Sequence, residues 1–269
     1  MNKTRMVLGV EYDGSGFFGW QWQTGQRNIQ QVLEQALSKI ANHPVTVQCA
    51  GRTDTGVHAL EQVVHFDTTT TRPLHAWLMG GNSQLPPDVR ITWVQAAIGD
   101  FHARYSAIAR FYRYVILNRP IKSALLRQQV TWCSASLNAE KMHQAAQALI
   151  GQHDFSSFRA QACQSKSPCR CIYFIDVSRD GDKVIMDISA NAFLHHMVRN
   201  IAGVLMAIGT DKQPVEWTQE LLTVKNRKLG GITAPPDGLY LGAVYYPKQY
   251  GIAKHPVFDK LPDNAKRFD

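Results

Sequence analysis

The sequence is poor in cysteine and has no long apolar run. Five cysteines in 269 residues are too few, and odd in number, for the disulfide framework of a small secreted protein. They fit a reducing compartment, so we expect a cytoplasmic protein. No apolar stretch approaches the roughly 18 residues of a membrane span, and Met6–Val10 is too short for a signal peptide. We therefore expect no membrane partner.

Acidic side chains are also outnumbered. Asp and Glu total 21 against 29 Lys and Arg, which gives a net charge of +8. Such a surplus favours a polyanionic partner, with nucleic acid first and an anionic membrane surface second. A merely soluble basic protein is the alternative, and composition alone does not separate them. With 45% hydrophobic residues the chain can bury a full core, which excludes a disordered or fibrous protein.

The chain divides into two parts of similar plan. Apolar periodicity and turn residues predict strands and amphipathic helices in both parts. The predicted elements are strands at 6–12, 45–49, 62–68 and 109–117, helices at 28–40, 138–150 and 193–209, and a hairpin at 171–189 with a type I′ turn at Asp180-Gly181. Mixed hairpin and helix signals indicate an α+β class. We expect one half over 1–104, a second over 105–247 and a polar tail over 248–269.

Three glycines after the first predicted strand have the spacing of a dinucleotide-binding loop. Gly14, Gly16 and Gly19 spell G-x-G-x-x-G. That site requires a helix that begins inside the motif, so that free amides face the pyrophosphate. Here the helix begins only near Asn28. A loop whose aromatic residues pack on the core is the favoured interpretation, and a nucleotide-dependent oxidoreductase is the alternative.

A group of cysteines in the second half invites a test for zinc. Cys163, Cys169 and Cys171 lie near His153, with the spacing C-x5-C-x-C. Zinc sites usually show paired C-x2–4-C knuckles. Buried or unused thiols are therefore the favoured interpretation.

The polar loop Gly51–Gly56 is the sharpest candidate for chemistry. Arg52 and Asp54 are bracketed by glycines between two apolar strands. An ordinary turn is one interpretation. The other is a carboxylate that rigid strands present for chemistry, and it needs a cationic partner to stay ionised. Arg199, which lies off the apolar stripe of the 193–209 helix, is a candidate partner, although an arginine that extends to water explains it equally well.

Arginines alternate with aromatic residues in the segment 101–118. In a strand, Arg110, Tyr112 and Tyr114 share one face. Arginine beside an aromatic ring suits phosphate contact and base stacking. An exposed polar face of an ordinary strand is the alternative.

Taken together, these motifs resemble the TruA family of tRNA pseudouridine synthases. The resemblance runs in order from about residue 9 to residue 246. The stretches that carry it are EYDGSGFFGWQWQ, AGRTDTGVHAL, NSQLPPDVRI, FHARYSAIARFYRY, GQHDFSSFRA, NAFLHHMVRNIAG and TAPPDGLYL. AGRTD-x-GVHA is highly specific among them.

The resemblance implies a fold and an activity. The fold is the pseudouridine synthase fold, with two similar α/β halves around a mixed, mostly antiparallel sheet and a central basic cleft. The activity is isomerisation of uridine to pseudouridine at positions 38, 39 and 40 in the anticodon stem-loop of tRNA. No redox step, ATP, metal or other cofactor is expected. The family also implies a homodimer, with the tRNA anticodon arm as partner.

The family's functional residues map onto this sequence. Asp54 corresponds to its single catalytic aspartate, Arg199 to the basic residue that keeps it ionised, and Tyr112 to the tyrosine that stacks on the target base. Arg52 is expected to support extrusion of the uridine. The other predicted RNA contacts are Arg104, Arg110 and His58. A non-catalytic RNA-binding protein on the same scaffold is the second hypothesis.

Overall fold

A computed structural model of the chain describes residues 3–252. It contains two compact units, which are considered separately. Of the described residues, 3–108 and 240–252 form the first unit, and 109–239 form the second. The domain bounds expected from the sequence stay a prediction. The division by contacts lies four residues beyond the predicted boundary and places residues 240–252 in the first unit. Within the described range no helix is long and apolar enough to span a membrane.

The first unit is a mostly antiparallel sheet with helices on one face. Its strands lie in the order β4-β1-β3-β10, and β2 is added on β3. All pairs are antiparallel except β10 with β3. The elements are β1 Thr4–Tyr12, η1 Gly14–Gly16, α1 Ile29–Ala41, β2 Gln48–Cys49, β3 His58–Thr68, α2 Leu74–Gln84, β4 Val89–Ala96, β10 Leu239–Tyr245 and η4 Lys248–Tyr250.

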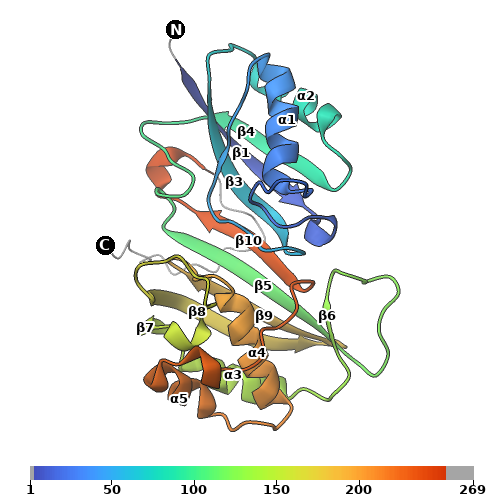
Figure 1. The fold of residues 1–269 in the computed structure, drawn as a ribbon, viewed down its shortest axis with the longest axis vertical. Helices are drawn as coiled ribbons and strands as arrows, with labels where there is room; N and C mark the ends of the chain where they lie inside the picture. The colour runs from blue at the N-terminus through green and yellow to red at the C-terminus, as the bar shows by residue number, and fades with distance from the viewer. Residues whose placement is uncertain (1–2, 253–269) are drawn as a thin grey trace. The chain divides into compact units, whose positions relative to one another are not determined.

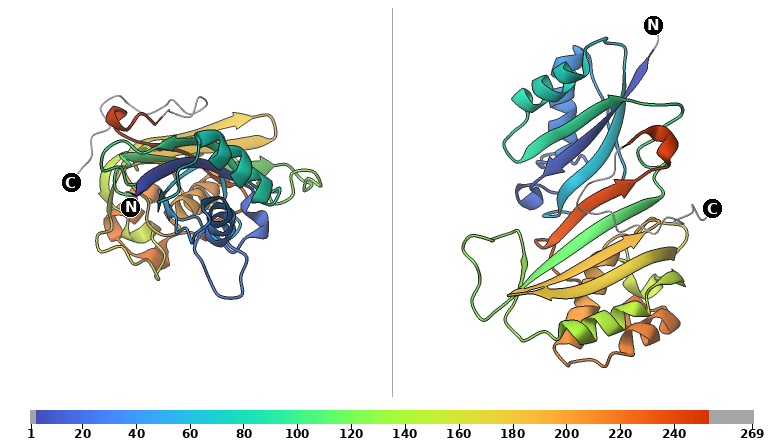
Figure 2. Two further views of the ribbon diagram at one scale, coloured as in Figure 1. Left: turned by 90° about the horizontal axis from the view of Figure 1, so that it is seen from above. Right: turned by 180° about the vertical axis from the view of Figure 1, so that it is seen from behind.

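Burial explains the layers of the first unit. The central strand β1 is almost continuously apolar because both of its faces are covered. Helices α1 and α2 lie on one face (Figures 1 and 2). Asn28 caps α1 by accepting the N–H of Gln31 at 2.9 Å, and the helix begins near Asn28 as predicted. On the sheet, Phe66 meets Trp77 of α2 edge to face, with the ring centroids 5.2 Å apart.

The second unit repeats this plan. Its strands lie in the order β5-β9-β8-β7, all antiparallel, and β6 pairs parallel with β5. The three helices lie on one face of this sheet (Figures 1 and 2). The elements are β5 Ala109–Asn118, β6 Thr131–Cys133, α3 Ala139–Gln147, β7 Gly151–Asp154, η2 Ser156–Phe158, β8 Cys169–Asp180, β9 Lys183–Ala190, α4 Met197–Gly209, α5 Trp217–Val224 and η3 Arg227–Leu229.

The predicted hairpin is present, but its turn is not the predicted one. Asp180 pairs with Lys183, so the turn residues are Gly181 and Asp182 rather than Asp180 and Gly181. Of the two, only Gly181 has a positive φ, of 53°. A II′ turn requires positive φ at its first central residue alone, whereas a type I′ turn requires it at both. The prediction was therefore wrong in two respects, because the turn lies one residue further along the chain and is not of type I′.

Two other predicted elements are shorter than expected. Of the predicted strand 45–49, only Gln48–Cys49 pairs in the sheet. The helix predicted over 193–209 begins at Met197, because His196 before it adopts a left-handed conformation with φ 61°. The α+β class with a mixed, mostly antiparallel sheet is confirmed within each unit. Most of the predicted tail lies outside the described residues.

Candidate active site

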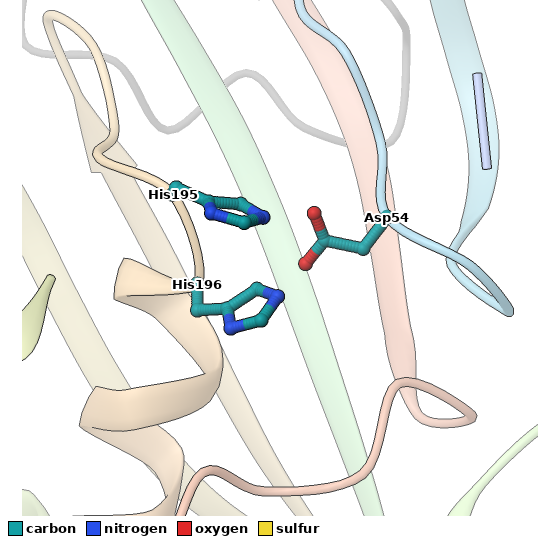
Figure 3. Close-up of side chains that lie close together, drawn as sticks. All are labelled: Asp54, His195 and His196. Atoms are coloured by element: carbon teal, nitrogen blue, oxygen red, sulfur yellow. The ribbon is translucent and has the colours of Figure 1, made fainter. Parts of the chain in front are cut away.

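Asp54 lies in a short loop, residues 51–56, that joins β2 to β3 and that we call the aspartate loop. The β2–β3 ladder continues into its base, where the N–H of Ala50 donates to the carbonyl of Val63 at 2.8 Å. The fully buried amide of Gln62 bonds both backbone groups of the residue that begins the loop. The paired strands β2 and β3 therefore fix the base of the loop that carries the half-buried Asp54 (Figure 3).

The glycine-rich loop, residues 14–20, packs against the aspartate loop with backbone on backbone. The N–H of Trp20 donates to the carbonyl of Thr53 at 3.0 Å, and the carbonyl of Phe17 accepts the N–H of the last residue of the aspartate loop at 3.3 Å. A Cβ on Gly19, whose φ is +81°, would lie 2.7 Å from the Thr53 carbonyl oxygen. Only glycine permits this approach.

Close packing accounts for two of the three glycines of the G-x-G-x-x-G motif without a nucleotide. A Cβ on Gly14 would lie 1.9 Å from the carbonyl oxygen of Val57, which directly follows the aspartate loop, so this glycine too is needed for close contact. The motif contains only the short turn η1, and α1 begins at Ile29. The dinucleotide alternative lacks the helix N-terminus that would bind a pyrophosphate.

His58 is a buried support of the glycine-rich loop and contacts its first residue. It is 3% exposed, and its Nδ1 accepts the N–H of Gly14 at 3.1 Å. The Asp13 carboxylate lies equally close to that nitrogen. The His58 ring stacks on Tyr240 with the centroids 4.7 Å apart, and burial raises the pKa of Tyr240 to about 12. These contacts give His58 a structural part, while its predicted contact with RNA stays a prediction.

Arg52 and Arg104, the other predicted RNA-binding residues of the first unit, are exposed. The Arg104 guanidinium lies 5.7 Å from the ring centroid of Tyr105, which is itself exposed. His102 lies against the same ring, with the centroids 4.3 Å apart. A cation beside open aromatic rings can contact a phosphate and stack on a base.

Tyr112 and Arg110 lie on β5 in the second unit, and both are nearly buried. Arg110 donates from Nη1 to the carbonyl of Asn191 at 2.8 Å. The Tyr112 ring meets Phe193 edge to face, with the centroids 5.1 Å apart at an angle of 84°. Phe193, which we expected in the core stripe of a helix, instead precedes α4.

Tyr114 shares its strand face with Tyr112 but is fully buried. Its hydroxyl donates to the carbonyl of Pro235 at 2.8 Å and lies 2.6 Å from the Thr131 hydroxyl. Burial raises the pKa of Tyr114. The face predicted for Arg110, Tyr112 and Tyr114 is therefore covered by protein at Tyr114, which leaves no ring there for base stacking.

The turn before α4 carries two histidines that we did not predict as site residues. The ring centroids of His195 and His196 lie 4.0 Å apart at the start of the helix (Figure 3). His196 has a left-handed backbone, a conformation that costs about 1–3 kcal/mol in a residue other than glycine. Such strain clusters at functional sites, but no residue pattern displays it in the sequence.

Arg199 lies in the first turn of α4 and is half-buried. Its Nε donates to the carbonyl of Ala234 at 2.9 Å, and the N–H of Ala234 donates back to the carbonyl of Arg199 at 3.1 Å. This reciprocal pair fixes the base of the side chain against the segment that leads to β10. Arg199 is therefore held in place, rather than extending freely to water.

The cysteines do not assemble into a ligand group. All five are free thiols. Cys171 is buried on β8, Cys169 is exposed, and burial raises the pKa of the Cys171 thiol. Among residues 3–252, no cluster of three potential metal ligands includes a cysteine. The zinc alternative therefore has no geometric support.

Comparison with known proteins gives a consistent result. The family model described as tRNA pseudouridine synthase matches residues 9–106 and 145–247. These ranges include Asp54 and Arg199 but not Tyr112. The tRNA pseudouridine synthase A of Methylococcus capsulatus is 60% identical over 264 residues, which cover 98% of this chain and 97% of the relative. That of Nitrosococcus oceani is 58% identical over 250 residues, which cover 93% and 96%.

One solved structure shows a distant likeness. An H/ACA RNP bound to a substrate RNA containing 2'-deoxyuridine aligns with 75% of this chain and 44% of its own, at 12% identity and a TM-score of 0.33. A likeness this weak carries no argument about fold or function.

Proposed function

Since the chain belongs to the tRNA pseudouridine synthase family, we propose that it modifies uridines 38, 39 and 40 in the anticodon stem-loop of tRNA. The family's activity is isomerisation of uridine to pseudouridine in tRNA, so the protein is an isomerase. The choice of positions rests on the motifs that resemble the TruA family, above all AGRTDTGVHAL.

The reaction exchanges one glycosidic bond for another. The N1–C1′ bond breaks, the detached uracil turns, and C5 forms a bond to C1′. C5 then loses its proton, and N1 gains one, so the atoms of the uridine are conserved. The target base must first leave the helical stack, which costs roughly a few kcal/mol. The reaction therefore requires a nucleophile or base, a surface that receives the extruded uracil, and cationic side chains that bind the RNA backbone.

We assign the catalytic carboxylate to Asp54. The observation that carries this assignment is the rigid presentation of the aspartate loop, which is fixed at its base by β2 and β3 and packed from one side by the glycine-rich loop. A catalytic group that is already oriented is more effective, because little orientational entropy is lost on reaching the transition state. A carboxylate in this position can add to the base or the sugar, or remove a proton.

We assign supporting parts to Arg199 and Tyr112. A cation near Asp54 keeps the carboxylate charged in a site from which water is excluded, and Arg199 is held at its Nε by Ala234. Tyr112 is the proposed stacking partner of the extruded base, and its hydroxyl is a candidate for proton transfer at C5. Phe193 fixes the Tyr112 ring edge to face.

RNA binding is assigned to basic side chains. Arg52 and Arg104 are exposed and suited to phosphate contact, and we propose Arg110 and His58 as further contacts. The net charge of +8 favours tRNA through release of counterions. We also propose a homodimer that acts in the cytoplasm, where tRNA serves translation.

A position-resolved assay tests the function. Purified protein is incubated with an anticodon stem-loop that has uridine at 38, 39 and 40, and pseudouridine is mapped at each position. A matched stem-loop with cytidine at these three positions and uridine elsewhere is the control. We expect product on the first RNA alone. Product on the control, or none on either RNA with binding intact, contradicts the assigned positions.

A further inference from the structure

We propose that Tyr12 is a positioning residue that aligns Asp54 through the hydroxyl of Thr53. The inference rests on the proposed role of Asp54 and adds a residue to that site. The Tyr12 hydroxyl lies 2.8 Å from Thr53 Oγ1, and both side chains are buried, with Tyr12 2% and Thr53 7% exposed. Thr53 directly precedes Asp54 in the aspartate loop.

Tyr12 is itself firmly placed. It ends β1, the central strand of its sheet, where it pairs with Ala59 of β3 and Val89 of β4. Its ring also contacts the buried Trp20, with the centroids 6.2 Å apart. The hydroxyl therefore extends toward the aspartate loop from a strand end that pairs with a neighbouring strand on each side.

Thr53 is held at two points. Its side chain bonds Tyr12, while its carbonyl accepts the N–H of Trp20 at 3.0 Å. One contact fixes the side chain, and the other fixes the peptide that leads into Asp54. Together the two bonds restrict rotation of the Thr53 backbone, and this narrows the directions in which the next side chain can extend.

Composition shows why the loop needs an external support. Glycines stand at both ends of the aspartate loop, at Gly51 and Gly56, and Gly56 has a φ of 78°. Glycine loses more conformational freedom on ordering than any other residue. The order of the loop must therefore come from neighbours, and the Tyr12 hydroxyl contacts the side chain of the residue directly before Asp54.

The effect of this bond is expected on turnover. A buried neutral hydrogen bond contributes about 1 kcal/mol, and if it is used to align the carboxylate its loss slows the chemical step about five- to tenfold. Substrate binding depends on the exposed cations, so KM is expected to stay unchanged. A merely structural bond would instead change stability and leave kcat alone.

The test compares Tyr12→Phe, Thr53→Val and Thr53→Ser with the wild-type full chain. Tyr250→Phe is the matched control, because Tyr250 in the same unit is also buried and donates its hydroxyl to Asp100 at 3.0 Å. Release of tritium from the C5 position of uridine in tRNA gives kcat and KM, and thermal unfolding gives stability.

We expect Tyr12→Phe and Thr53→Val to lower kcat about five- to tenfold at unchanged KM. Thr53→Ser, which keeps a hydroxyl, should restore most of the rate, and Tyr250→Phe should lose only stability. Equal kcat in Tyr12→Phe and Tyr250→Phe, or no rescue by Thr53→Ser, overturns the proposal. Lack of release by the wild type would instead count against the proposed function, so the two failures are distinguishable.

Discussion

The Arg227 guanidinium donates to the side-chain oxygen of Asn200 at 3.0 Å and so ties η3 to α4. The Thr233 hydroxyl bonds the same oxygen at 2.6 Å, and Arg227 also donates to Thr233 at 2.9 Å. Asn200 is buried, and its amide donates to the carbonyl of Phe158. Thr233 directly precedes Ala234, whose carbonyl accepts from Arg199, so the network fixes the backbone that Arg199 contacts.

Loss of this network should lower the stability of the protein. We expect Arg227→Ala to lower the free energy of unfolding by about 2 kcal/mol, because a charge-assisted bond is lost and a buried oxygen loses a donor. Arg227→Lys should restore little of the lost stability, because one ammonium group cannot replace the planar guanidinium. The neighbouring, exposed Lys228→Ala is the control in urea unfolding. Equal midpoints for Arg227→Ala and Lys228→Ala would contradict this role.

Glu61 should make the protein less stable at alkaline pH. It is 5% exposed on β3, and burial raises its pKa from 4.5 to about 7, although the indole N–H of Trp93 donates to it at 3.1 Å. The folded state therefore holds a proton that the unfolded chain releases. The stability from the neutral form is complete below about pH 4.5 and is lost as pH rises through 7, by up to about 3 kcal/mol.

Glu61→Gln, which stays neutral and can still accept from Trp93, should unfold at a higher temperature than the wild type at pH 8 and at a similar one near pH 4.5. His65 acts in the opposite sense over the same window, because burial and the nearby charges of His102 and Arg5 lower its pKa to about 4. The comparison is therefore made between variant and wild type at each pH. A difference in melting temperature that does not change with pH would rule out titration of Glu61.

Arg199→Leu should impair turnover more than binding. The substitution removes the cation proposed to keep Asp54 ionised, while the exposed arginines proposed to contact RNA remain. We expect kcat to fall by at least about tenfold with little change in tRNA affinity. Filter binding and tritium release measured on one preparation separate the two. Equal loss of both would indicate that Arg199 serves the fold or the RNA contact instead.

Affinity for tRNA should fall steeply as salt rises. A protein that neutralises several phosphates releases their counterions, so the logarithm of affinity declines linearly with the logarithm of salt concentration. Arg104→Gln should weaken binding and make this slope shallower by roughly one contact. A flat salt response would contradict the view that the charge of +8 serves RNA binding.

Local signals in the sequence predicted much of the fold. The helices predicted over 28–40 and 138–150 begin where expected, since the side chains of Asn28 and Asn138 accept backbone N–H groups at the starts of α1 and α3. What failed depends on conformation that no periodicity encodes. The left-handed His196 moves the start of α4 by four residues, and Gly181 alone supplies the positive φ of the hairpin turn. α2 and β10 were missed because the first has only a weak apolar stripe and the second is a short strand far along the chain from its partner.

The candidate site shows the same limits. Asp54 was identified from its bracketing glycines and from the family resemblance. The reason for Gly14 and Gly19 was not, since close contact between two loops leaves no mark except the glycines themselves. The Tyr12–Thr53 bond joins residues 41 apart in sequence, which no local pattern reveals.

The most direct test of the account uses Asp54→Asn, which keeps the size of the side chain but can act neither as nucleophile nor as base. Tritium release from C5 of uridine in tRNA is measured beside tRNA binding and thermal unfolding, with the exposed Asp180→Asn as the control. We predict wild-type binding and folding, full release by the wild type and the control, and no release by Asp54→Asn. Turnover by Asp54→Asn at the wild-type rate would remove Asp54 from the mechanism.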